Sequence, residues 1–386
     1  MTAPRPTGMP IDNEQRLADL FDDHVEIGLH HGAQLAVYED GQEVFARAGG
    51  TTGPEDEDDT RDMTTADKMV LFSCTKPLTA VCIHQLVEAG ELDYDDTIRT
   101  YWPEFADADE PKGAVTVRHV LSHQGGFPVG PFDAQPEDWT DWDAVVAAME
   151  DVELQFEPGE TAAYHPMNYG WVLGELLRRV TGQRIGAYLR EHVTDPLGMD
   201  DTHLGLPPAE PDEVATLWGF EEFDRARDPE RGLGGDNAGA AANFNREAAH
   251  RAEMPAASAV GTARDMARFY ACLEQGGALD GTRILEESTV EAMTTLQIHV
   301  EHDSTIGVAR RYGLGVGLGG TATDSYGTLA PPSSFGHGGL GSSITWADPD
   351  AGLAVAYLTN GIREGYEQRV RANDVGDAVR RTFGAN

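Results

Sequence analysis

Hydrophobic residues follow a helical spacing near the N-terminus and then change to the alternation that is typical of strands. Apolar residues repeat with helical spacing over 13–30, which predicts an α-helix there. The next segment, 33–50, predicts two strands that meet at Asp40-Gly41, a strong signal for a β-hairpin. An acidic stretch, 53–62, follows and predicts a loop.

Helical periodicity dominates the middle of the chain. The segments with this pattern, several of them ended by glycine or preceded by a capping residue, are 74–90, 116–123, 142–150, 168–182 and 262–276. A long stretch, 203–255, is rich in glycine, alanine, asparagine and acidic residues. Its length and composition predict an irregular loop or a lid over a site.

Strand patterns return in the C-terminal part of the chain. Four such segments, joined by short turns, are 312–320, 333–339, 342–349 and 352–360, and a helical pattern over 368–383 ends the chain. Because the strands lie at both ends and do not alternate with helices, a doubly wound parallel sheet is not expected. We predict an α+β fold in which N- and C-terminal strands form one antiparallel sheet, flanked by helices, with a mostly helical region inserted between them.

One domain with two subdomains accounts for this order of elements. A chain of 386 residues is long enough to bury a substantial core. We predict a single domain over 1–386. In it, 12–70 and 256–386 form the sheet subdomain, and 71–255 form the mostly helical subdomain.

The net charge is −38, from 66 acidic against 28 basic residues, and just three of the basic residues are lysines: Lys68, Lys76 and Lys112. Such an acidic surface repels nucleic acid and anionic membranes, so we expect neither as a partner. The acidic residues are scattered through a regular apolar pattern, which argues against disorder. Together with the scarcity of lysine, this favours a halophilic protein that stays soluble in a salt-rich cytosol.

The sequence gives no indication of export, membrane insertion or metal binding. There is no run of about 18 apolar residues, and the N-terminus lacks the apolar segment of a secretory signal, so we expect a cytoplasmic protein. The three cysteines, Cys74, Cys82 and Cys272, are too few for a disulfide framework and show no metal-ligand spacing. We therefore expect buried cysteines, no metal site and no cofactor.

A serine and a lysine three residues apart, in "SCTKP", form the first candidate for chemistry. Proline is tolerated only in the first turn of a helix, so Pro77 requires a helix that begins close to Ser73. Positions three apart share one face, which lets Lys76 reach the Ser73 hydroxyl. A serine nucleophile needs such a partner, and burial can lower the pKa of a lysine toward that role. The alternative is a surface lysine after a helix-capping serine, since Ser-x-x-Lys also occurs by chance.

Five ordered blocks of sequence favour the catalytic interpretation. They are "SCTKPLTAVCIHQLVEAGELDYDDTIRTYWPEF", "TVRHVLSHQGGFP", "FEPGETAAYHPMNYGWVLGELLRRVTGQ", "VGTARDMARFYACLEQGG" and "FGHGGLGSSITWADPDAGLAVAYLTNG". In this order and spacing the chain resembles the serine β-lactamase and penicillin-binding-protein superfamily, specifically its class C-like esterase branch, the family VIII carboxylesterases. The resemblance extends along nearly the whole chain and implies a β-lactamase/transpeptidase-like fold.

The resemblance implies a role for each member of a catalytic set. Ser73 would be the acylated nucleophile, and Lys76 would accept or relay its proton. Tyr164, in "YHP", matches the family tyrosine that serves as general base in acylation and as proton donor to the leaving group. A phenol with a pKa of about 10 can act as a base only where adjacent cations stabilise its phenolate.

Two positions depart from the β-lactamase pattern. Pro166 stands where the tyrosine motif has asparagine, and "HGG" at 337–339 stands where the third motif begins with lysine. In the resemblance, both changes remove groups that hold the amide and the carboxylate of a β-lactam. We expect His337 to hydrogen-bond Tyr164 or the substrate, the alternative being a structural histidine.

The glycines of the third motif predict a close approach of backbone to ligand. Gly338 and Gly339 lack a Cβ atom, so the strand can lie against a substrate. A backbone N–H near Gly339 or Leu340 would face the Ser73 N–H and complete an oxyanion hole. Other candidates are mainly structural: His123, and three tryptophans that line an acyl pocket or pack in the core, Trp139, Trp142 and Trp346.

These features together predict a cytoplasmic serine hydrolase that cleaves small-molecule carboxylic esters. The reaction would pass through an acyl-enzyme on Ser73, with Lys76 and Tyr164 as the proton-transfer pair. The alternative on the same scaffold is a β-lactamase or a D-amino-acid peptidase or amidase. A third hypothesis, a catalytically silent ligand-binding protein, is disfavoured because the serine, lysine and tyrosine are all retained.

The charge generates a first prediction, that the fold depends on salt. The Debye length is about 30 Å at 0.01 M salt and about 3 Å at 1 M, so in dilute buffer the acidic side chains repel one another across the surface. Thermal unfolding in 0.05 M and in 2 M KCl should show a clearly higher melting temperature in 2 M KCl. An unchanged melting temperature would contradict the halophilic interpretation.

Overall fold

The computed structural model describes residues 13–54, 60–130, 138–220, 236–363 and 365–384. An eight-stranded sheet with the order β2-β1-β13-β12-β11-β10-β9-β8 is its largest element, and every neighbouring pair in it is antiparallel. Its strands are β1 (Gly32–Glu39), β2 (Gln42–Gly50), β8 (Ile298–Val300), β9 (Arg310–Tyr312), β10 (Gly317–Leu318), β11 (Phe335–Gly339), β12 (Ser343–Asp348) and β13 (Leu353–Thr359). N- and C-terminal strands therefore share one sheet, which confirms the predicted α+β fold.

The predicted N-terminal hairpin is present, with its turn at Asp40 and Gly41. Both residues have positive φ, 47° and 75°, which is the conformation of a two-residue type I′ turn. Its twist matches that of the flanking strands β1 and β2, which pair from Gly32↔Gly50 to Glu39↔Gln42 with one bulge. The Asp-Gly signal in the sequence therefore identified both the turn and the register.

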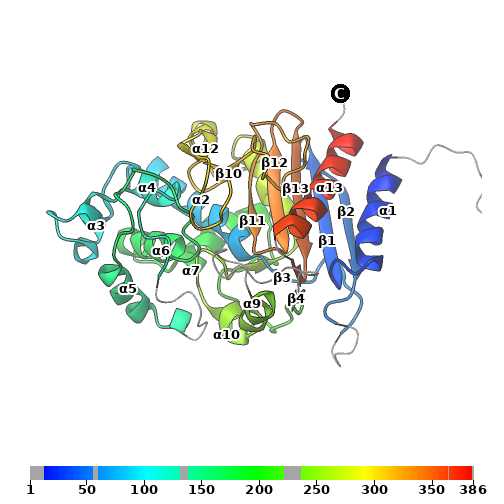
Figure 1. The fold of residues 1–386 in the computed structure, drawn as a ribbon, viewed down its shortest axis with the longest axis horizontal. Coiled ribbons are helices and arrows are strands. Elements are labelled where there is room, and N and C mark those ends of the chain that lie inside the picture. Colours follow the sequence, from blue (N-terminus) through cyan, green and yellow to red (C-terminus); the bar gives the residue numbers. More distant parts are fainter. Residues whose placement is uncertain (1–12, 55–59, 131–137, 221–235, 364, 385–386) are drawn as a thin grey trace, which may run out of the picture.

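Both faces of the sheet are covered by helices. These are α1 (Asn13–Glu26) and α13 (Gly365–Phe383), which lie side by side over one face, and α11 (Ala263–Glu274), which packs on the other (Figure 1). Side chains of β1 alternate between the two sides: Leu35 and Val37 lie in the cluster under α1 and α13, and Ala36 and Tyr38 in the cluster with α11. A sheet covered on both faces explains why β1 is apolar almost throughout.

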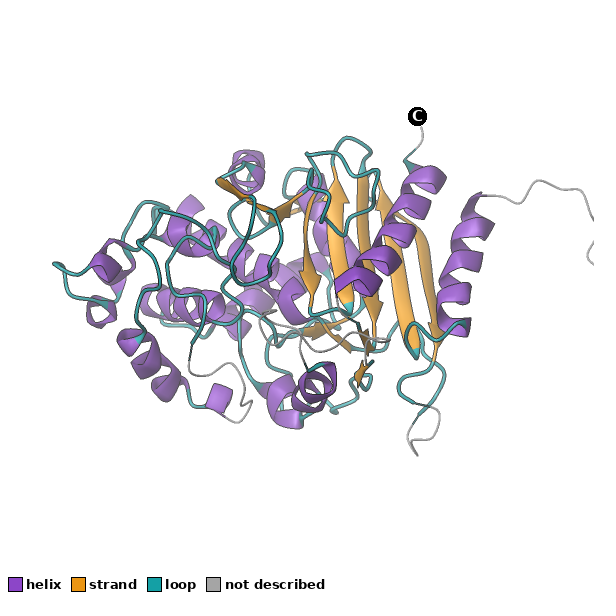
Figure 2. Cartoon of the chain, viewed as in Figure 1, coloured by secondary structure: helices purple, strands orange, loops and turns teal. Residues whose placement is uncertain are grey.

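A mostly helical region lies on the β11 side of the sheet (Figures 1 and 2). Its helices are α2 (Thr75–Glu88), α3 (Ile98–Tyr101), α4 (Val117–Leu121), α5 (Trp142–Asp151), α6 (Asn168–Thr181), α7 (Ile185–Leu189), α8 (Asp195–Leu197), α9 (Asn237–Phe244) and α10 (Glu247–Arg251). The helix α2 is buried on nearly all sides, as expected for a helix at the centre of a core. One continuous cluster of buried side chains extends from α11 and the sheet into this region. The division into subdomains at residues 70 and 256 remains a prediction.

Short elements complete the fold. They are α12 (Glu287–Thr294) and three two-stranded pairs, β3 (Met69–Val70) with β5 (Val260–Gly261), β4 (Trp218–Gly219) with β14 (Gly361–Ile362), and β6 (Ala278–Leu279) with β7 (Thr282–Arg283). The β3–β5 pair is important for the site because the chain leaves β3 directly for the turn that carries Ser73. In the described part of the chain, no helix has the length and apolarity needed to cross a membrane.

Two sequence predictions need correction. The segment 312–320 is not one strand, because the chain turns between β9 and β10, where Gly313 N–H donates to the Val316 carbonyl. Gly315 has φ +90°, and a Cβ atom there would lie 2.2 Å from Ala80 Cβ, so the turn rests directly on α2. The stretch 203–255 is not wholly irregular either, since it contains β4, α9 and α10; its residues 221–235 lie outside the described part.

Candidate active site

The turn that carries Ser73 connects β3 to α2. Residues Phe72–Cys74 form one turn of 3₁₀-helix, and α2 begins at Thr75, so Pro77 lies in its first turn as the sequence predicts. Phe72 has φ +46°, a conformation that is uncommon for a residue with a side chain and typical of strained functional sites. The strained turn places the Ser73 side chain, which is partly exposed, beside the buried start of α2.

Lys76 is fully buried and its amine contacts three oxygen atoms. The Nζ atom lies 3.2 Å from Ser73 Oγ, 2.7 Å from the Pro166 carbonyl oxygen and 3.0 Å from the Ala256 carbonyl oxygen. The structure thus brings Lys76 to Ser73, as the three-residue spacing predicts. Pro166, which stands in place of the β-lactamase asparagine, contributes its backbone carbonyl to this contact.

Tyr164 lies next to the same amine. Lys76 Nζ is 4.8 Å from the centre of the Tyr164 ring. Burial raises the pKa of the Tyr164 phenol, and the nearby Ser73 side chain counteracts part of this rise. The buried Tyr164 Oη forms no hydrogen bond of ordinary geometry within the described part of the chain. The resting phenol is therefore protonated, and its hydroxyl lies beside the Ser73 side chain.

A buried carboxylate that sequence reasoning missed fixes the position of Tyr164. Asp303 is fully buried, and its Oδ2 accepts from the Tyr164 N–H at 2.8 Å and from the Tyr312 hydroxyl at 2.7 Å. Its Oδ1 accepts from the N–H groups of Thr305 and Ile306, at 2.9 and 3.2 Å. Four donors satisfy this carboxylate, which holds the Tyr164 backbone against the loop before β9. In a chain with 66 acidic residues, one aspartate in a loop gives no distinguishing sequence signal.

Two histidines pack behind Tyr164. The His123 ring lies 4.7 Å from the Tyr164 ring, and its Nδ1 accepts from the His165 N–H at 3.1 Å. His165 in turn donates from Nδ1 to the Ala163 carbonyl and accepts at Nε2 from the Phe127 N–H. Burial lowers the pKa of both imidazoles, that of His165 to about 3 and that of His123 well below its ordinary value. Both rings are therefore neutral near pH 7, and the expectation that His123 is structural stays a prediction.

His337 contacts Tyr164 through its ring and not through the predicted hydrogen bond. The two ring centres are 5.9 Å apart, and His337 Nδ1 donates to the Gly338 carbonyl at 2.8 Å. Burial lowers the pKa of His337 to about 3. A neutral imidazole thus occupies the position at which the β-lactamase motif has a charged lysine.

The strand β11 lies directly against the turn that carries Ser73. A Cβ atom on Gly339 would be 2.6 Å from the Leu71 carbonyl oxygen and 3.0 Å from Phe72 Cβ, so only glycine fits there without a shift of backbone. Cys74 Sγ donates to the His337 carbonyl at 3.2 Å and adds a second link between the two segments. The neighbouring Gly338 is exposed and has space for a Cβ atom.

Leu340 follows β11 and packs, partly buried, on the cluster that contains Phe72. The backbone after Gly339 therefore runs beside Ser73, where an oxyanion hole would require it. The oxyanion hole itself remains a proposal.

Of the three tryptophans considered for an acyl pocket, one lies near the nucleophile turn. Trp139 packs 5.3 Å from Phe244, which packs 4.6 Å from Phe72. Trp142 packs between α5 and α6. Trp346 lies in the cluster under α1 and α13, on the face of the sheet opposite to α11. Trp139 is therefore the tryptophan that remains a candidate wall of the acyl pocket.

The three cysteines are free and buried, as predicted. Burial raises the pKa of the Cys74 thiol to about 12, so it does not compete with its neighbour Ser73 as a nucleophile. Among the described residues, no group of three or more histidine, cysteine, aspartate or glutamate side chains could hold a metal ion.

The sequence of this chain matches the family model named Beta-lactamase over residues 17–378. The chain belongs to the β-lactamase family. The curated relative "Esterase/beta-lactamase LipL" of Mycobacterium tuberculosis is 34% identical over 354 residues, which cover 85% of this chain and 77% of that protein.

Solved structures extend the likeness to the fold of the whole chain. A penicillin-binding-protein homologue from Caulobacter crescentus has a TM-score of 0.81 at 31% identity and covers 97% of this chain and 99% of its own. A family VIII carboxylesterase has a TM-score of 0.79 at 29% identity and covers 96% of this chain and 98% of its own. These findings confirm the resemblance predicted from the five sequence blocks. The chain is an enzyme of the serine hydrolase class.

The contact at Gly339 generates a prediction about the site. We expect Gly339→Ala to lose at least tenfold in kcat/KM, because the added methyl group forces β11 away from the Leu71–Phe72 backbone. Overpacking of this kind costs about 1–3 kcal/mol of stability. Thermal unfolding and steady-state kinetics on a p-nitrophenyl ester measure the two effects.

The matched control is Gly338→Ala, one residue earlier on the same strand. Its added methyl group would meet Ile344 Cδ1 at an ordinary 3.6 Å, so the melting temperature should be unchanged. Equal destabilisation by the two substitutions would contradict the assigned contact.

Proposed function

We propose that this enzyme hydrolyses small-molecule carboxylic esters through an acyl-enzyme on Ser73. The observation that carries the proposal is the contact of 3.2 Å between Lys76 Nζ and Ser73 Oγ, made beside a protonated Tyr164. A hydroxyl that touches a buried amine and lies on a strained turn is arranged for nucleophilic attack.

The proposed reaction has two halves, acylation of Ser73 and hydrolysis of the acyl-enzyme, and the same groups act in both. Ser73 Oγ attacks the ester carbonyl carbon while its proton passes to the Lys76 amine, which takes part in its uncharged form and becomes the ammonium. The oxygen of the tetrahedral intermediate accepts hydrogen bonds from the Ser73 N–H and from an N–H at Gly339 or Leu340. As the C–O bond to the alcohol breaks, the Tyr164 phenol donates a proton to the leaving alkoxide and is reprotonated through Lys76. Water then attacks the acyl carbon with the same proton transfers, and the carboxylic acid is released.

Two features favour esters over β-lactams as substrates. Pro166 offers a carbonyl to Lys76 and no side-chain amide to a substrate, and the pKa of about 3 for His337 removes a cation that would hold a β-lactam carboxylate. Several relatives of this chain are named as esterases, which supports the same choice. LipL is named as both an esterase and a β-lactamase, so β-lactam hydrolysis is the second candidate function.

A substrate panel tests the choice between the two functions. In molar KCl we expect p-nitrophenyl acetate and butyrate to be hydrolysed faster than longer esters and much faster than nitrocefin. Ser73→Ala should abolish both ester hydrolysis and labelling by a fluorophosphonate probe, whereas Cys74→Ala should keep both. Nitrocefin turnover above that of the short esters would overturn the proposal, and labelling that survives Ser73→Ala would identify a different nucleophile.

A substitution of Lys76 tests the proton transfer. Arginine stays charged at any working pH and cannot relay a proton, so Lys76→Arg should lower kcat/KM by about 10²–10⁴-fold, the usual contribution of a general base. Because Lys76 is fully buried, Lys76→Met serves as a second variant of smaller volume that lacks both the charge and the basic nitrogen. Both variants should lose activity and remain folded by circular dichroism, and Lys76→Met should have a lower melting temperature because the Pro166 and Ala256 carbonyls lose their donor.

Lys68→Arg is the matched control for this substitution. Lys68 is partly exposed, and its Nζ lies 3.7 Å from the exposed carboxylate of Asp201. Lys112 is unsuitable because it is buried, with its Nζ 2.7 Å from the carbonyl oxygens of Met149 and Glu150. A Lys76→Arg enzyme within about threefold of the wild type would refute the proposed role.

A further inference from the structure

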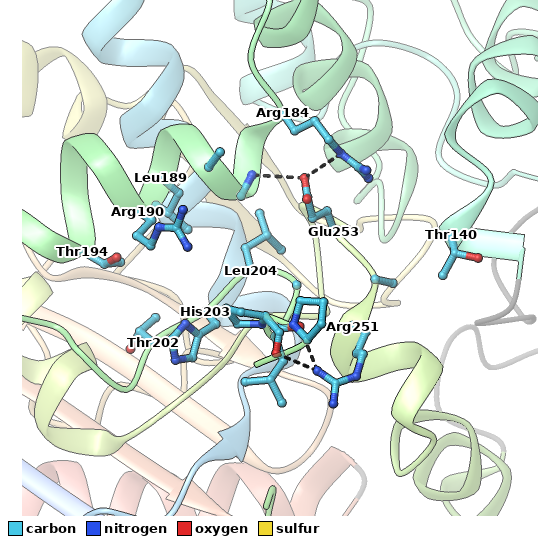
Figure 3. A pocket seen from close by; sticks show the side chains of 17 residues that line it. Thr140, Arg184, Leu189, Arg190, Thr194, Thr202, His203, Leu204, Arg251 and Glu253 are labelled. Carbon is cyan, nitrogen blue, oxygen red and sulfur yellow. Dashed lines mark hydrogen bonds and ion pairs between the residues drawn. The ribbon is translucent and has the colours of Figure 1, made fainter. Parts of the chain in front are cut away.

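A cavity of about 390 Å³ opens beside α7, away from the catalytic residues. Its lining comes from α7 and the turn after it, from 202–208, and from 251–253 next to α10 (Figure 3). Ser73, Lys76 and Tyr164 are absent from this lining. The volume lies within the range of small-molecule sites, about 300–1,000 Å³.

Three arginines line this cavity in a protein whose net charge is −38. They are Arg184, Arg190 and Arg251, and Figure 3 shows them reaching the cavity from different segments. Glu253 is the acidic residue of the lining. The lining itself therefore carries three guanidinium groups and one carboxylate, and Glu247, which pairs with Arg251, lies just outside it.

Two of the arginines already bind carboxylates of the protein, and each uses some of its N–H groups to do so. Arg184 Nε lies 3.2 Å from Glu253 Oε2, and the same oxygen accepts from the Gly186 N–H at 3.3 Å. Arg251 Nε donates to Glu247 at 2.7 Å, while its Nη1 donates to the Pro207 carbonyl at 2.8 Å. The Glu253 carboxylate is thus held by a guanidinium and a backbone N–H, a combination that suits carboxylates and phosphates.

Arg190 differs from the other two. Within the described part of the chain its guanidinium forms no ion pair and no side-chain hydrogen bond, and its side chain is exposed. All of its donors are therefore available to a ligand. Burial and then the charge of Lys68 lower the pKa of His203, Glu210 and Asp201 oppose this, and Arg190 adds a smaller lowering contribution. Arg190 and the partly buried imidazole of His203 thus belong to one polar wall of the cavity.

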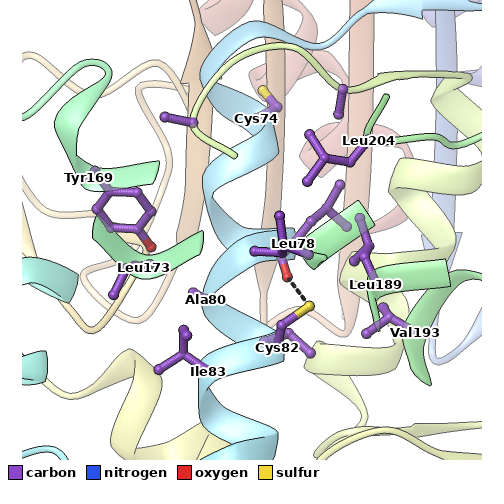
Figure 4. Close-up of a cluster of buried hydrophobic side chains, with 14 of the residues drawn as sticks. Cys74, Leu78, Ala80, Cys82, Ile83, Tyr169, Leu173, Leu189, Val193 and Leu204 are labelled. Carbon is purple, nitrogen blue, oxygen red and sulfur yellow. Dashed lines mark hydrogen bonds between the residues drawn. The ribbon is translucent and has the colours of Figure 1, made fainter. Parts of the chain in front are cut away.

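Buried leucines form the apolar floor of the cavity. Leu189, Leu204 and Leu206 are buried residues of the lining. Leu189 and Leu204 also pack on the buried side chains around Leu78 of α2, behind the nucleophile turn (Figure 4). A ligand with an apolar body and one anionic end would place its body on this floor and its charge against the arginines.

We propose that this cavity is a second binding site, which takes a small organic anion: a carboxylate or phosphate monoester with a short apolar body. The anionic group contacts Arg190, with the unused donors of Arg184 beside it, and the apolar body rests on the leucine floor. This assignment is independent of the reaction at Ser73, since none of the three arginines contacts the catalytic residues.

Isothermal titration calorimetry on the full chain, at one fixed KCl concentration that keeps it folded, tests the proposal. The probes are hexanoate, hexyl phosphate and inorganic phosphate. We expect hexanoate or hexyl phosphate to bind the wild type, and Arg190→Gln to weaken that binding at least tenfold, as for the loss of a charge-assisted hydrogen bond. Ester hydrolysis by Arg190→Gln should stay at the wild-type rate.

Arg16→Gln is the matched control, because it removes the same charge from an exposed position on α1. This variant should bind the probes as the wild type does. The relative affinity of hexanoate and hexyl phosphate identifies which anionic group the site prefers. Absence of binding by both, equal affinity for hexyl phosphate and inorganic phosphate, or an affinity of Arg190→Gln within twofold of the wild type would each overturn the proposal.

Discussion

The buried contacts of Lys76 join the parts of the chain that make up the site. One amine contacts the Ser73 hydroxyl, the Pro166 carbonyl and the Ala256 carbonyl, and these belong to three segments that are far apart in sequence. The burial of an amine is costly unless its donors are satisfied, so these segments must assemble around it. The geometry of Ser73 and the position of the loop that carries Tyr164 thus depend on the same side chain. This constraint also explains why a lysine remains here in a chain that otherwise uses arginine for nearly all of its cations.

The strand β11 supplies the second half of the site through a steric constraint. The sheet brings β11 against the Leu71–Phe72 backbone, and the contact is close enough to require glycine at 339. A glycine at this point loses more conformational entropy on folding than other residues do, and the covered sheet compensates by fixing β11 between β10 and β12. The site is therefore rigid on the sheet side, where the proposed oxyanion hole lies.

Local sequence signals predicted much of this structure, and long-range contacts account for what they missed. The turn at Asp40-Gly41, the helix start near Pro77 and the approach of Lys76 to Ser73 each depend on residues within a few positions of one another. Asp303 could not be predicted, because its role arises from a contact with Tyr164 across 139 positions. The turn at Gly315 was hidden in a strand-like pattern, since what requires it is the neighbouring Ala80 of α2. The arginine cavity was likewise invisible, because Arg251 lies far from Arg184 and Arg190 in sequence and becomes their neighbour only through the fold.

A fall in pH has two opposite effects on the stability of this protein, one through its buried histidines and one through its surface carboxylates. Burial lowers the pKa of His24 and His84 to about 4 and that of His165 and His337 to about 3, from 6.5 in the unfolded chain. As the pH falls below 6.5, the unfolded chain takes up protons that these folded imidazoles cannot, so the folded state loses stability down to about pH 3. Over the lower part of the same range, protonation of surface carboxylates reduces the net charge of −38 and relieves their mutual repulsion. Salt screens the repulsion between exposed acids but leaves the desolvated histidines almost unaffected. At high salt, the gain in stability from carboxylate protonation should therefore disappear, while the loss of stability from the buried histidines remains. The fold should be most stable at high salt and at a pH above the ordinary pKa of histidine.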